Sequence, residues 1–363
     1  MCLEDFRKPQ TTEREGSIEF QRTEATDRRR PNHRRHVQLS EAYLDASPFD
    51  HVEALIILVE HRHIQSGALH ILTALSQHTT QSILQQIPQA YVKLVDFKNI
   101  FSLNGKVAVV TGGSRGLGLH AASGLAQAGC SKIFITSRKA KACEEACAAL
   151  NALGTPCKAI SIPADLAKQG EVERLVKEVE KHTDKVDILF ANAGATWGEE
   201  FDKHPESAFQ KVMQLNVTSV FTCAQKFAPL LRKAGSIEDP ARIIITASIA
   251  GIGVGTLGKQ ATFGYSASKA AALHLTRNLA LELGPQGILV NSLAPGFFPT
   301  KMASGLMEMS GGVKKLAEFT PNKRLGKAED IAAAVVYLCS RGGSHINGGN
   351  IVLDGGSVLQ AKL

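Results

Sequence analysis

Hydrophobic residues follow two different patterns along the chain, and the change comes near residue 98. From there to the C-terminus, short continuous apolar runs rich in β-branched residues alternate with stretches of helical length. Parallel strands covered by helices on both faces have this pattern, whereas half-exposed strands alternate between apolar and polar positions. The apolar runs are KVAVVTGG, KIFITSR, CKAISIPAD, VDILFANAG, ARIIITAS, GILVNSLAPG and GGNIVLDGG.

The stretches between these runs predict helices on both faces of the sheet. Helices are expected at about residues 117–127, in the stretch that ends near residue 150, and at about 172–182. Strands that alternate with helices form doubly wound sheets, whose ligands bind at the carboxyl ends of the strands. Residues 98–363 are therefore predicted to form one α/β domain with a Rossmann-like, doubly wound parallel sheet.

The first 97 residues predict an N-terminal extension of a different kind. Residues 1–40 are polar and charged without a hydrophobic period, which indicates disorder. Over residues 41–90, the segments HVEALIILVEH and GALHILTALSQHTTQSILQQI place apolar residues at helical spacing, and Pro88 can end the second helix. We expect residues 1–97 to be partly disordered and, over 41–90, helical.

Net charge alone does not identify a nucleic-acid-binding protein here. The net charge is +7, and the most basic run is DRRRPNHRRH at residues 27–36. Such a run is more often a solvated tail than a nucleic-acid or sorting contact, and no aromatic residues interrupt it to stack on bases. We expect no nucleic-acid partner.

The chain also shows no pattern of a membrane or secreted protein. It contains no apolar run of about 18 residues, and its N-terminus has no apolar signal segment. A mitochondrial transit peptide is the alternative that the arginines allow, but acidic residues argue against it. These are Glu13, Glu15, Glu19, Glu24 and Asp27. The seven cysteines form no CxxC pair, so we expect reduced thiols and a cytoplasmic protein.

Two pairs of residues could be read as metal ligands. Cys143 and Cys147 are four residues apart on an expected helix, and His61 and His63 are two residues apart. The spacing of the histidines puts them on different sides of a helix, and no carboxylate or cysteine motif accompanies them. The cysteine pair could hold a metal but is more often incidental, so we expect no metal site.

The first expected strand runs into TGGSRGLGLHAA, which has the glycine spacing T-G-x-x-x-G-x-G from Thr111 to Gly118. Glycines allow a tight turn and a close approach to a pyrophosphate, and a helix N-terminus offers free N–H groups to it. A glycine-rich turn is a weak signal alone, but here it lies between a strand and a helix at the first βα crossing. The loop therefore predicts a dinucleotide site.

The second strand indicates which nicotinamide cofactor is bound. An NAD site places Asp or Glu about 20 residues beyond the glycine loop, where it holds the ribose 2′-hydroxyl. This chain has Arg138 at that distance, and Ser114 and Arg115 stand within the loop. These side chains can bind a 2′-phosphate through charge-assisted hydrogen bonds. Although both arginines could be ordinary surface residues, the pattern favours NADP(H).

The chain resembles the short-chain dehydrogenase/reductase family over about residues 98–363. The motifs that carry the resemblance occur in family order. They are TGGSRGLG, ADL with Asp165, ANAG at 191–194, QLNV with Asn216, IIITASIAG with Ser248, YSASK, PGFFPT and NGGNIVLDGG. Within the family, NAGATWG, VMQLNVTSVF and PLLRKAGSIEDPARII are similar to NADPH-dependent β-ketoacyl reductases of the rhamnolipid-pathway type.

The resemblance implies a set of cofactor-binding residues. Asp165 would face the adenine, Asn192 and its small neighbours would leave room beside the cofactor, and Thr300 would hold the nicotinamide carboxamide. The other implied cofactor residues are Gly112, Gly116, Leu117, Gly118, Leu166, Ala193, Gly194, Tyr265, Lys269, Pro295, Gly296 and Phe298.

Tyr265 and Lys269 are four residues apart, so they share one face of a helix. A free tyrosine has a pKa near 10, and a lysine ammonium one turn away would lower it toward neutral pH. The resemblance makes Tyr265 the proton donor, Ser248 the hydrogen-bond donor to the substrate oxygen, and Asn216 the anchor of a water relay. Lys269 would also hold the nicotinamide ribose.

The substrate is predicted less directly than the reaction. We expect reduction of a 3-oxoacyl thioester or a polyketide-type ketone, with sugars, steroids, quinones and secondary-metabolite ketones as rivals. A non-catalytic NADP-binding scaffold is the alternative from another class.

Two segments could shape the substrate site. A lid over an acyl chain could be formed by Phe297, Phe298 and KMASGLMEMSGG (301–312), although these residues could instead pack in the core. The segment before Tyr265 could reshape the substrate mouth. The resemblance also implies a homotetramer or a homodimer.

Overall fold

The computed structural model describes residue 94 and residues 96–300 and 312–360. The chain divides into two units, Met1–Val92 and Lys93–Leu363. The helices expected over 41–90, the predicted disorder over 1–40 and the histidines of EHRHIQ lie outside the described residues, and so does most of the predicted lid. The extension therefore remains a prediction, and the fold and the site belong to the second unit.

Seven parallel strands form one sheet in the described part of this unit, in the order β3-β2-β1-β4-β5-β6-β7. The strands are β1 (Val107–Thr111), β2 (Lys132–Thr136), β3 (Lys158–Ser161), β4 (Ile188–Ala191), β5 (Ala241–Thr246), β6 (Ile288–Pro295) and β7 (Asn350–Leu353). Each strand lies within one of the seven apolar runs of the sequence. The predicted doubly wound sheet is confirmed.

Helices connect and cover these strands. They are α3 (Gly116–Gln127), α4 (Ala140–Asn151), α5 (Glu171–Glu180), α6 (Glu206–Met213), α7 (Ser219–Ala234), α8 (Phe263–Leu283), α10 (Gly312–Phe319) and α11 (Ala328–Cys339). A π-helical turn, η4 (Gln214–Thr218), joins α6 to α7. Short 3-10 turns include η5 (Ile249–Gly251) and η6 (Gly258–Gln260). None of the helices in the described residues is long and apolar enough to cross a membrane.

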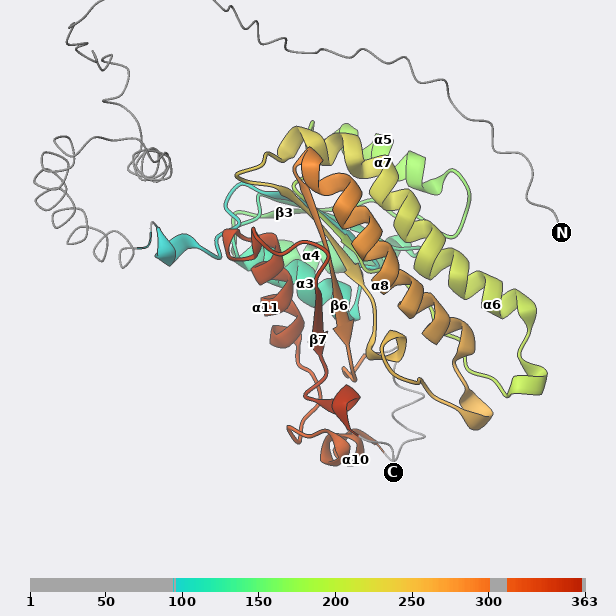
Figure 1. The fold of residues 1–363 in the computed structure, drawn as a ribbon. Coiled ribbons are helices and arrows are strands. Elements are labelled where there is room, and N and C mark those ends of the chain that lie inside the picture. The colour runs from blue at the N-terminus through green and yellow to red at the C-terminus, as the bar shows by residue number, and fades with distance from the viewer. Residues whose placement is uncertain (1–93, 95, 301–311, 361–363) are drawn as a thin grey trace, which may run out of the picture. The chain divides into compact units, whose positions relative to one another are not determined.

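The core lies in two layers, one on each face of the sheet. Val109 packs with residues of α5, α7 and α8, whereas its neighbours Ala108 and Val110 pack with residues of α3, α4 and α11. Figure 1 shows α7 and α8 on one side of the strands and α3, α4 and α11 on the other. Because successive side chains of a strand point to opposite faces, a sheet buried on both faces requires the continuous apolar runs.

The order of strands reverses direction between β1 and β4, and a crevice opens there at their carboxyl ends. Hydrogen bonds fix the two strand ends to each other. The hydroxyl of Thr111 accepts the backbone N–H groups of Asn192 and Ala193, both at 2.9 Å, and the amide of Asn192 donates to the carbonyl of Thr111 at 3.1 Å. The fold thus sets a rigid floor under the predicted dinucleotide site.

Candidate active site

Ser248 lies just beyond β5, where the chain leaves the sheet. Its backbone is extended, and its hydroxyl accepts the N–H of Ala250 at 3.2 Å, which caps the short turn η5. The same hydroxyl donates to the carbonyl of Pro295 at 3.5 Å, at the end of β6. Ser248 is buried and is held between two strand ends.

Tyr265 and Lys269 come from the first turns of α8. The lysine Nζ lies 5.5 Å from the centre of the tyrosine ring and donates a hydrogen bond of 2.7 Å to the carbonyl of Thr246. Small residues let the helix come this close to η5, because a Cβ on Gly251 would lie 2.5 Å from the carbonyl carbon of Lys269. The helix therefore presents the pair beside Ser248.

The pKa values of this pair differ from the expectation that Lys269 lowers the pKa of Tyr265. Burial raises the pKa of the Tyr265 phenol, and a hydrogen bond with Ser248 opposes that rise. Burial also lowers the pKa of Lys269 to about 8. The physical reason is loss of hydration, which disfavours the charged form of each group and is the largest cause of both shifts. A tyrosine that keeps its proton near neutral pH suits a proton donor.

Asn216 lies in the π-helical turn η4 and is buried. Its side-chain oxygen accepts the N–H of Ala195 at 2.8 Å, and its amide donates to the carbonyl of Ala195 and to the hydroxyl of Ser268, both at 2.9 Å. The side chain therefore holds the segment after β4 against α8. This is a positioning role, and the predicted water relay remains a prediction.

The glycine loop lies between β1 and α3 as predicted. Gly112 and Gly116 have positive φ values of 64° and 54°, which favour glycine. Helix α3 begins at Gly116, and its N-cap residue, Arg115, makes no side-chain capping hydrogen bond. The N–H groups of the first turn are thus left for an anionic ligand.

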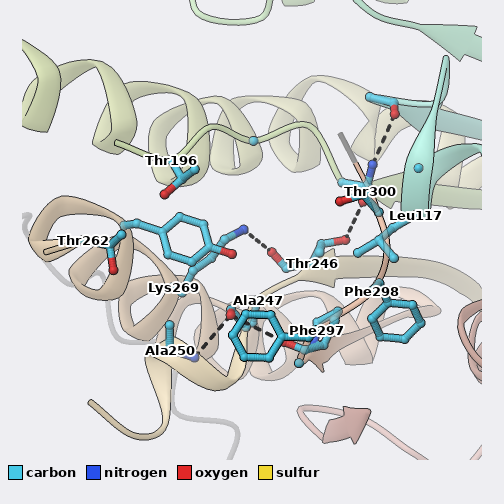
Figure 2. Close-up of a pocket in the computed structure, with 18 of the residues that line it drawn as sticks. Leu117, Thr196, Thr246, Ala247, Ala250, Thr262, Lys269, Phe297, Phe298 and Thr300 are labelled. Atoms are coloured by element: carbon cyan, nitrogen blue, oxygen red, sulfur yellow. Dashed lines mark hydrogen bonds between the residues drawn. The ribbon is translucent and has the colours of Figure 1, made fainter. Parts of the chain in front are cut away.

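A cavity of about 830 Å³ joins the glycine loop to Ser248, Tyr265 and Lys269. All the predicted site residues except Gly118 and Asn216 line it. Figure 2 shows Thr300 and Leu117 near one end, Lys269 with its hydrogen bond to Thr246, and the two threonines Thr196 and Thr262 near the other end. The structure therefore brings the separately predicted residues to one site.

Gly118 has a packing role in the glycine loop. A Cβ there would lie 2.6 Å from the amide nitrogen of Asn192 and would also overlap the carbonyl oxygen of Gly112, so the glycine lets α3 pack against the loop. Gly118 does not line the cavity, and its predicted contact with the cofactor remains a prediction.

At the end of β2, the cavity is lined by three basic side chains, Arg115, Arg138 and Lys139. None of them has an ion pair or hydrogen bond with another of the described residues. Beside them, the hydroxyl of Thr136 is buried without a hydrogen-bond partner in the described part of the chain. Lys139 was not predicted, although its position next to Arg138 was a signal that could have found it.

The aromatic pair of the predicted lid divides between two roles. Phe298 is 3% exposed and packs in the core layer of α3 and α11, although one side of it reaches the cavity. A Cβ on Gly326 would overlap its ring. Phe297 is only partly buried and lines the cavity. The Met-containing segment over 301–311 lies outside the described residues.

The segment before α8, which was expected to reshape the substrate mouth, lines the cavity through Val254, Thr256, Gln260 and Thr262. Other residues of the cavity wall had no local sequence signal. They come from the segment after β4, from α10 and the residue that follows it, and from the turn after β7. They are Thr196, Leu316, Phe319, Thr320, Ser357, Val358 and Gln360. Only the fold places these residues around one cavity.

Comparisons with known proteins identify relatives of this chain over most of the α/β domain. The family described as enoyl-(acyl carrier protein) reductase matches residues 112–358. The rhamnolipids biosynthesis 3-oxoacyl-[acyl-carrier-protein] reductase of Pseudomonas aeruginosa is 43% identical over 256 residues, which cover 70% of this chain and 97% of the relative. The 5-keto-D-gluconate 5-reductase of Escherichia coli is 32% identical over 263 residues, 72% of this chain and 98% of the relative.

A solved structure described as the Pseudomonas aeruginosa RhlG/NADP active-site complex has the same fold. It is 42% identical, with a TM-score of 0.67, and the match covers 72% of this chain and 99% of that one. The sheet order, the glycine loop and the grouping of Ser248, Tyr265 and Lys269 are thus accompanied by clear sequence similarity. The chain belongs to the short-chain dehydrogenase/reductase family and is an oxidoreductase of that family.

Proposed function

We propose that this protein is an NADPH-dependent carbonyl reductase that reduces a 3-oxoacyl thioester or a related polyketide-type ketone to the hydroxyl. The observation that carries the proposal is one cavity, lined at one end by unpaired basic side chains and at the other by Ser248, Tyr265 and Lys269. The similarity to a 3-oxoacyl-[acyl-carrier-protein] reductase supports the substrate class.

The residues present fit NADP(H). The glycine loop and the uncapped start of α3 suit a pyrophosphate, since Gly112 and Gly116 allow close approach of the backbone. Arg115 and Arg138 would bind the 2′-phosphate, with Lys139 beside them. When bound, NADPH supplies the hydride.

The protein's own groups would orient the substrate and supply the proton. The Ser248 hydroxyl and the Tyr265 hydroxyl would both donate hydrogen bonds to the ketone oxygen, which draws electron density from the carbonyl carbon. As the oxygen gains negative charge, the Tyr265 hydroxyl transfers its proton to it. Burial raises the pKa of Tyr265, so the phenol still holds this proton near neutral pH. Lys269 would stabilise the negative charge that then forms on the tyrosine oxygen.

NADPH oxidation, followed with acetoacetyl thioesters, sugars, steroids, quinones and simple ketones, tests the proposal. We expect turnover with the 3-oxoacyl thioesters, a preference for NADPH over NADH, and a loss of about 100-fold or more in kcat for Tyr265→Phe. NADPH binding to the variant, measured by fluorescence, should persist. Binding without turnover of any ketone would instead support the scaffold alternative. Size-exclusion chromatography tests the proposed homotetramer or homodimer.

A further inference from the structure

Two threonines of the cavity wall have hydroxyls that the fold does not use. Thr196 is exposed, and Thr262 is half-buried. Thr262 holds the N-cap position of α8, but its side chain makes no capping hydrogen bond. Thr196 follows Ala195, which Asn216 holds through both its N–H and its carbonyl. Neither hydroxyl has a hydrogen-bond partner among the described residues, and both line the cavity.

The backbone on which these threonines stand is fixed on both sides. The N–H of Glu199 donates to the carbonyl of Ala261 at 3.1 Å, which joins the segment after β4 to the segment before α8. A Cβ on Gly198 would lie 3.1 Å from the carbonyl oxygen of Gln260, so the two segments are in close contact. Figure 2 shows Thr196 and Thr262 near the same end of the pocket. Thr196 and Thr262 therefore stand on two segments that are joined to each other, and not on independent loops.

Charge at this end of the cavity restricts what the hydroxyls can bind. The charged side chains that line the cavity, within the described ranges, are Arg115, Arg138, Lys139, Asp165 and Lys269. The first four belong to the nucleotide end, and the ammonium of Lys269 donates to the carbonyl of Thr246. A carboxylate of the substrate would lack the basic partner that such groups usually have. An uncharged oxygen needs only a hydroxyl donor.

Apolar side chains also line the cavity. They are Phe297, which follows β6, Leu316 and Phe319 of α10, and Val358 in the turn after β7. A substrate that uses both the hydroxyls and these side chains has an uncharged oxygen on one side of its ketone and a hydrocarbon chain on the other. A 3-oxoacyl thioester has this arrangement, because one methylene separates its ketone from the thioester carbonyl.

We propose that the hydroxyls of Thr196 and Thr262 donate hydrogen bonds to the second carbonyl oxygen of the substrate while Ser248 and Tyr265 hold the ketone. This inference rests on the proposed function and adds the residues that select β-dicarbonyl substrates from simple ketones. The threonines are binding residues and take no part in proton transfer.

A pair of substrates that differ in one carbonyl tests the inference. S-(3-oxohexanoyl)-N-acetylcysteamine carries both carbonyls, and S-(3-oxohexyl)-N-acetylcysteamine has a methylene in place of the thioester carbonyl. We measure the ratio of kcat/KM for the two compounds. The wild type should prefer the thioester, and the double variant Thr196→Val, Thr262→Val should lower this ratio about tenfold, mainly through KM. Thr222→Val, on α7 outside the cavity, should leave the ratio unchanged.

Other results would overturn the inference. If the double variant lowers kcat/KM for both compounds equally, the threonines have only a structural role. An unchanged ratio, or a wild type without preference, would also exclude the proposed contacts. A wild type that reduces neither compound contradicts the proposed function instead. In that case, binding of the thioester tests the inference by itself. The thioester should quench the fluorescence of enzyme-bound NADPH more weakly in the double variant than in the wild type, and equal quenching would reject the inference.

Discussion

The ammonium group of Lys269 donates a hydrogen bond of 2.7 Å to the backbone carbonyl of Thr246, the last residue of β5. This bond joins helix α8 to the strand that leads into Ser248, two residues further on. It therefore fixes the position of Tyr265 relative to Ser248. The lysine side chain is 4% exposed, so the charge that makes the bond is held at a cost in hydration.

Replacement of this lysine by methionine should change how stability depends on pH, and in a defined direction. Burial lowers the pKa of Lys269 from 10.5 to about 8, so the unfolded chain binds more protons than the folded protein between these values. Wild-type stability should therefore rise with pH from 7 to 9 relative to Lys269→Met, by roughly 1 kcal/mol. Urea unfolding of both proteins at pH 7 and pH 9 measures this difference.

Other titratable groups also make the free energy of unfolding depend on pH, but both proteins share these groups, so their contribution cancels in the comparison. Lys233→Met, at an exposed position near the end of α7, is a control that should show no such pH dependence relative to the wild type. If the difference in the free energy of unfolding between the wild type and Lys269→Met is the same at pH 7 and pH 9, the pKa of Lys269 is not lowered.

Arg138 should decide between the two nicotinamide cofactors. It lines the cavity and has no ion pair within the described residues, so its charge is available to a 2′-phosphate. Arg138→Asp should weaken NADPH binding by about 10- to 100-fold, because a charge-assisted hydrogen bond is lost and a repulsive charge is added. The affinity for NADH, which has no 2′-phosphate, should change much less. Fluorescence titration with both nucleotides measures the two dissociation constants.

Arg277→Asp is the matched control, since this arginine is exposed on α8 and does not line the cavity. It should leave both dissociation constants within about twofold of the wild type, because exposed charges at this distance are screened. Equal weakening of NADPH and NADH by Arg138→Asp would show that the arginine does not contact the 2′-phosphate.

The sheet could be predicted because its signal is local. Each strand coincides with one continuous apolar run, and the burial of both faces makes such a run necessary. The helices expected at 117–127 and 172–182 correspond to α3 (Gly116–Gln127) and α5 (Glu171–Glu180), with ends that differ by one or two residues. Gly112 and Gly116, which have positive φ, could also be recognised locally, from their spacing in the turn between a strand and a helix.

The parts of the site that escaped prediction depend on contacts between distant segments. Nothing in the sequence around Val358 shows that the turn after β7 reaches the wall of the cavity. The burial of Tyr265 and Lys269, which reverses the expected effect on the tyrosine pKa, also arises only when α8 packs against η5. Spacing gives neighbours on a helix, whereas hydration depends on the whole fold.

Gly118 provides a test of packing in the glycine loop. A Cβ at this position would lie 2.6 Å from the amide nitrogen of Asn192, so Gly118→Ala must displace the loop or the start of α3. We expect a loss of about 1–3 kcal/mol in the free energy of unfolding. The affinity for NADPH should fall by roughly tenfold or more. In Gly253→Ala, the new methyl group would meet only an ordinary contact at 3.6 Å, so unfolding should change little. Equal stability of the two variants would contradict the packing role of Gly118.

Asn216 should matter through the backbone that it holds. Asn216→Ala removes three hydrogen bonds and leaves the N–H and carbonyl of Ala195 and the hydroxyl of Ser268 without this partner. A buried group without a partner costs about 1–3 kcal/mol, and only the bond to Ser268 is fully buried while the two bonds to Ala195 are partly buried. The free energy of unfolding should therefore fall by roughly 2–4 kcal/mol. Asn278 is exposed on α8, and its amide donates to the carbonyl of His274, so Asn278→Ala should cost less than about 0.5 kcal/mol. Urea midpoints compare the two variants, and similar midpoints would show that the segment after β4 does not depend on Asn216.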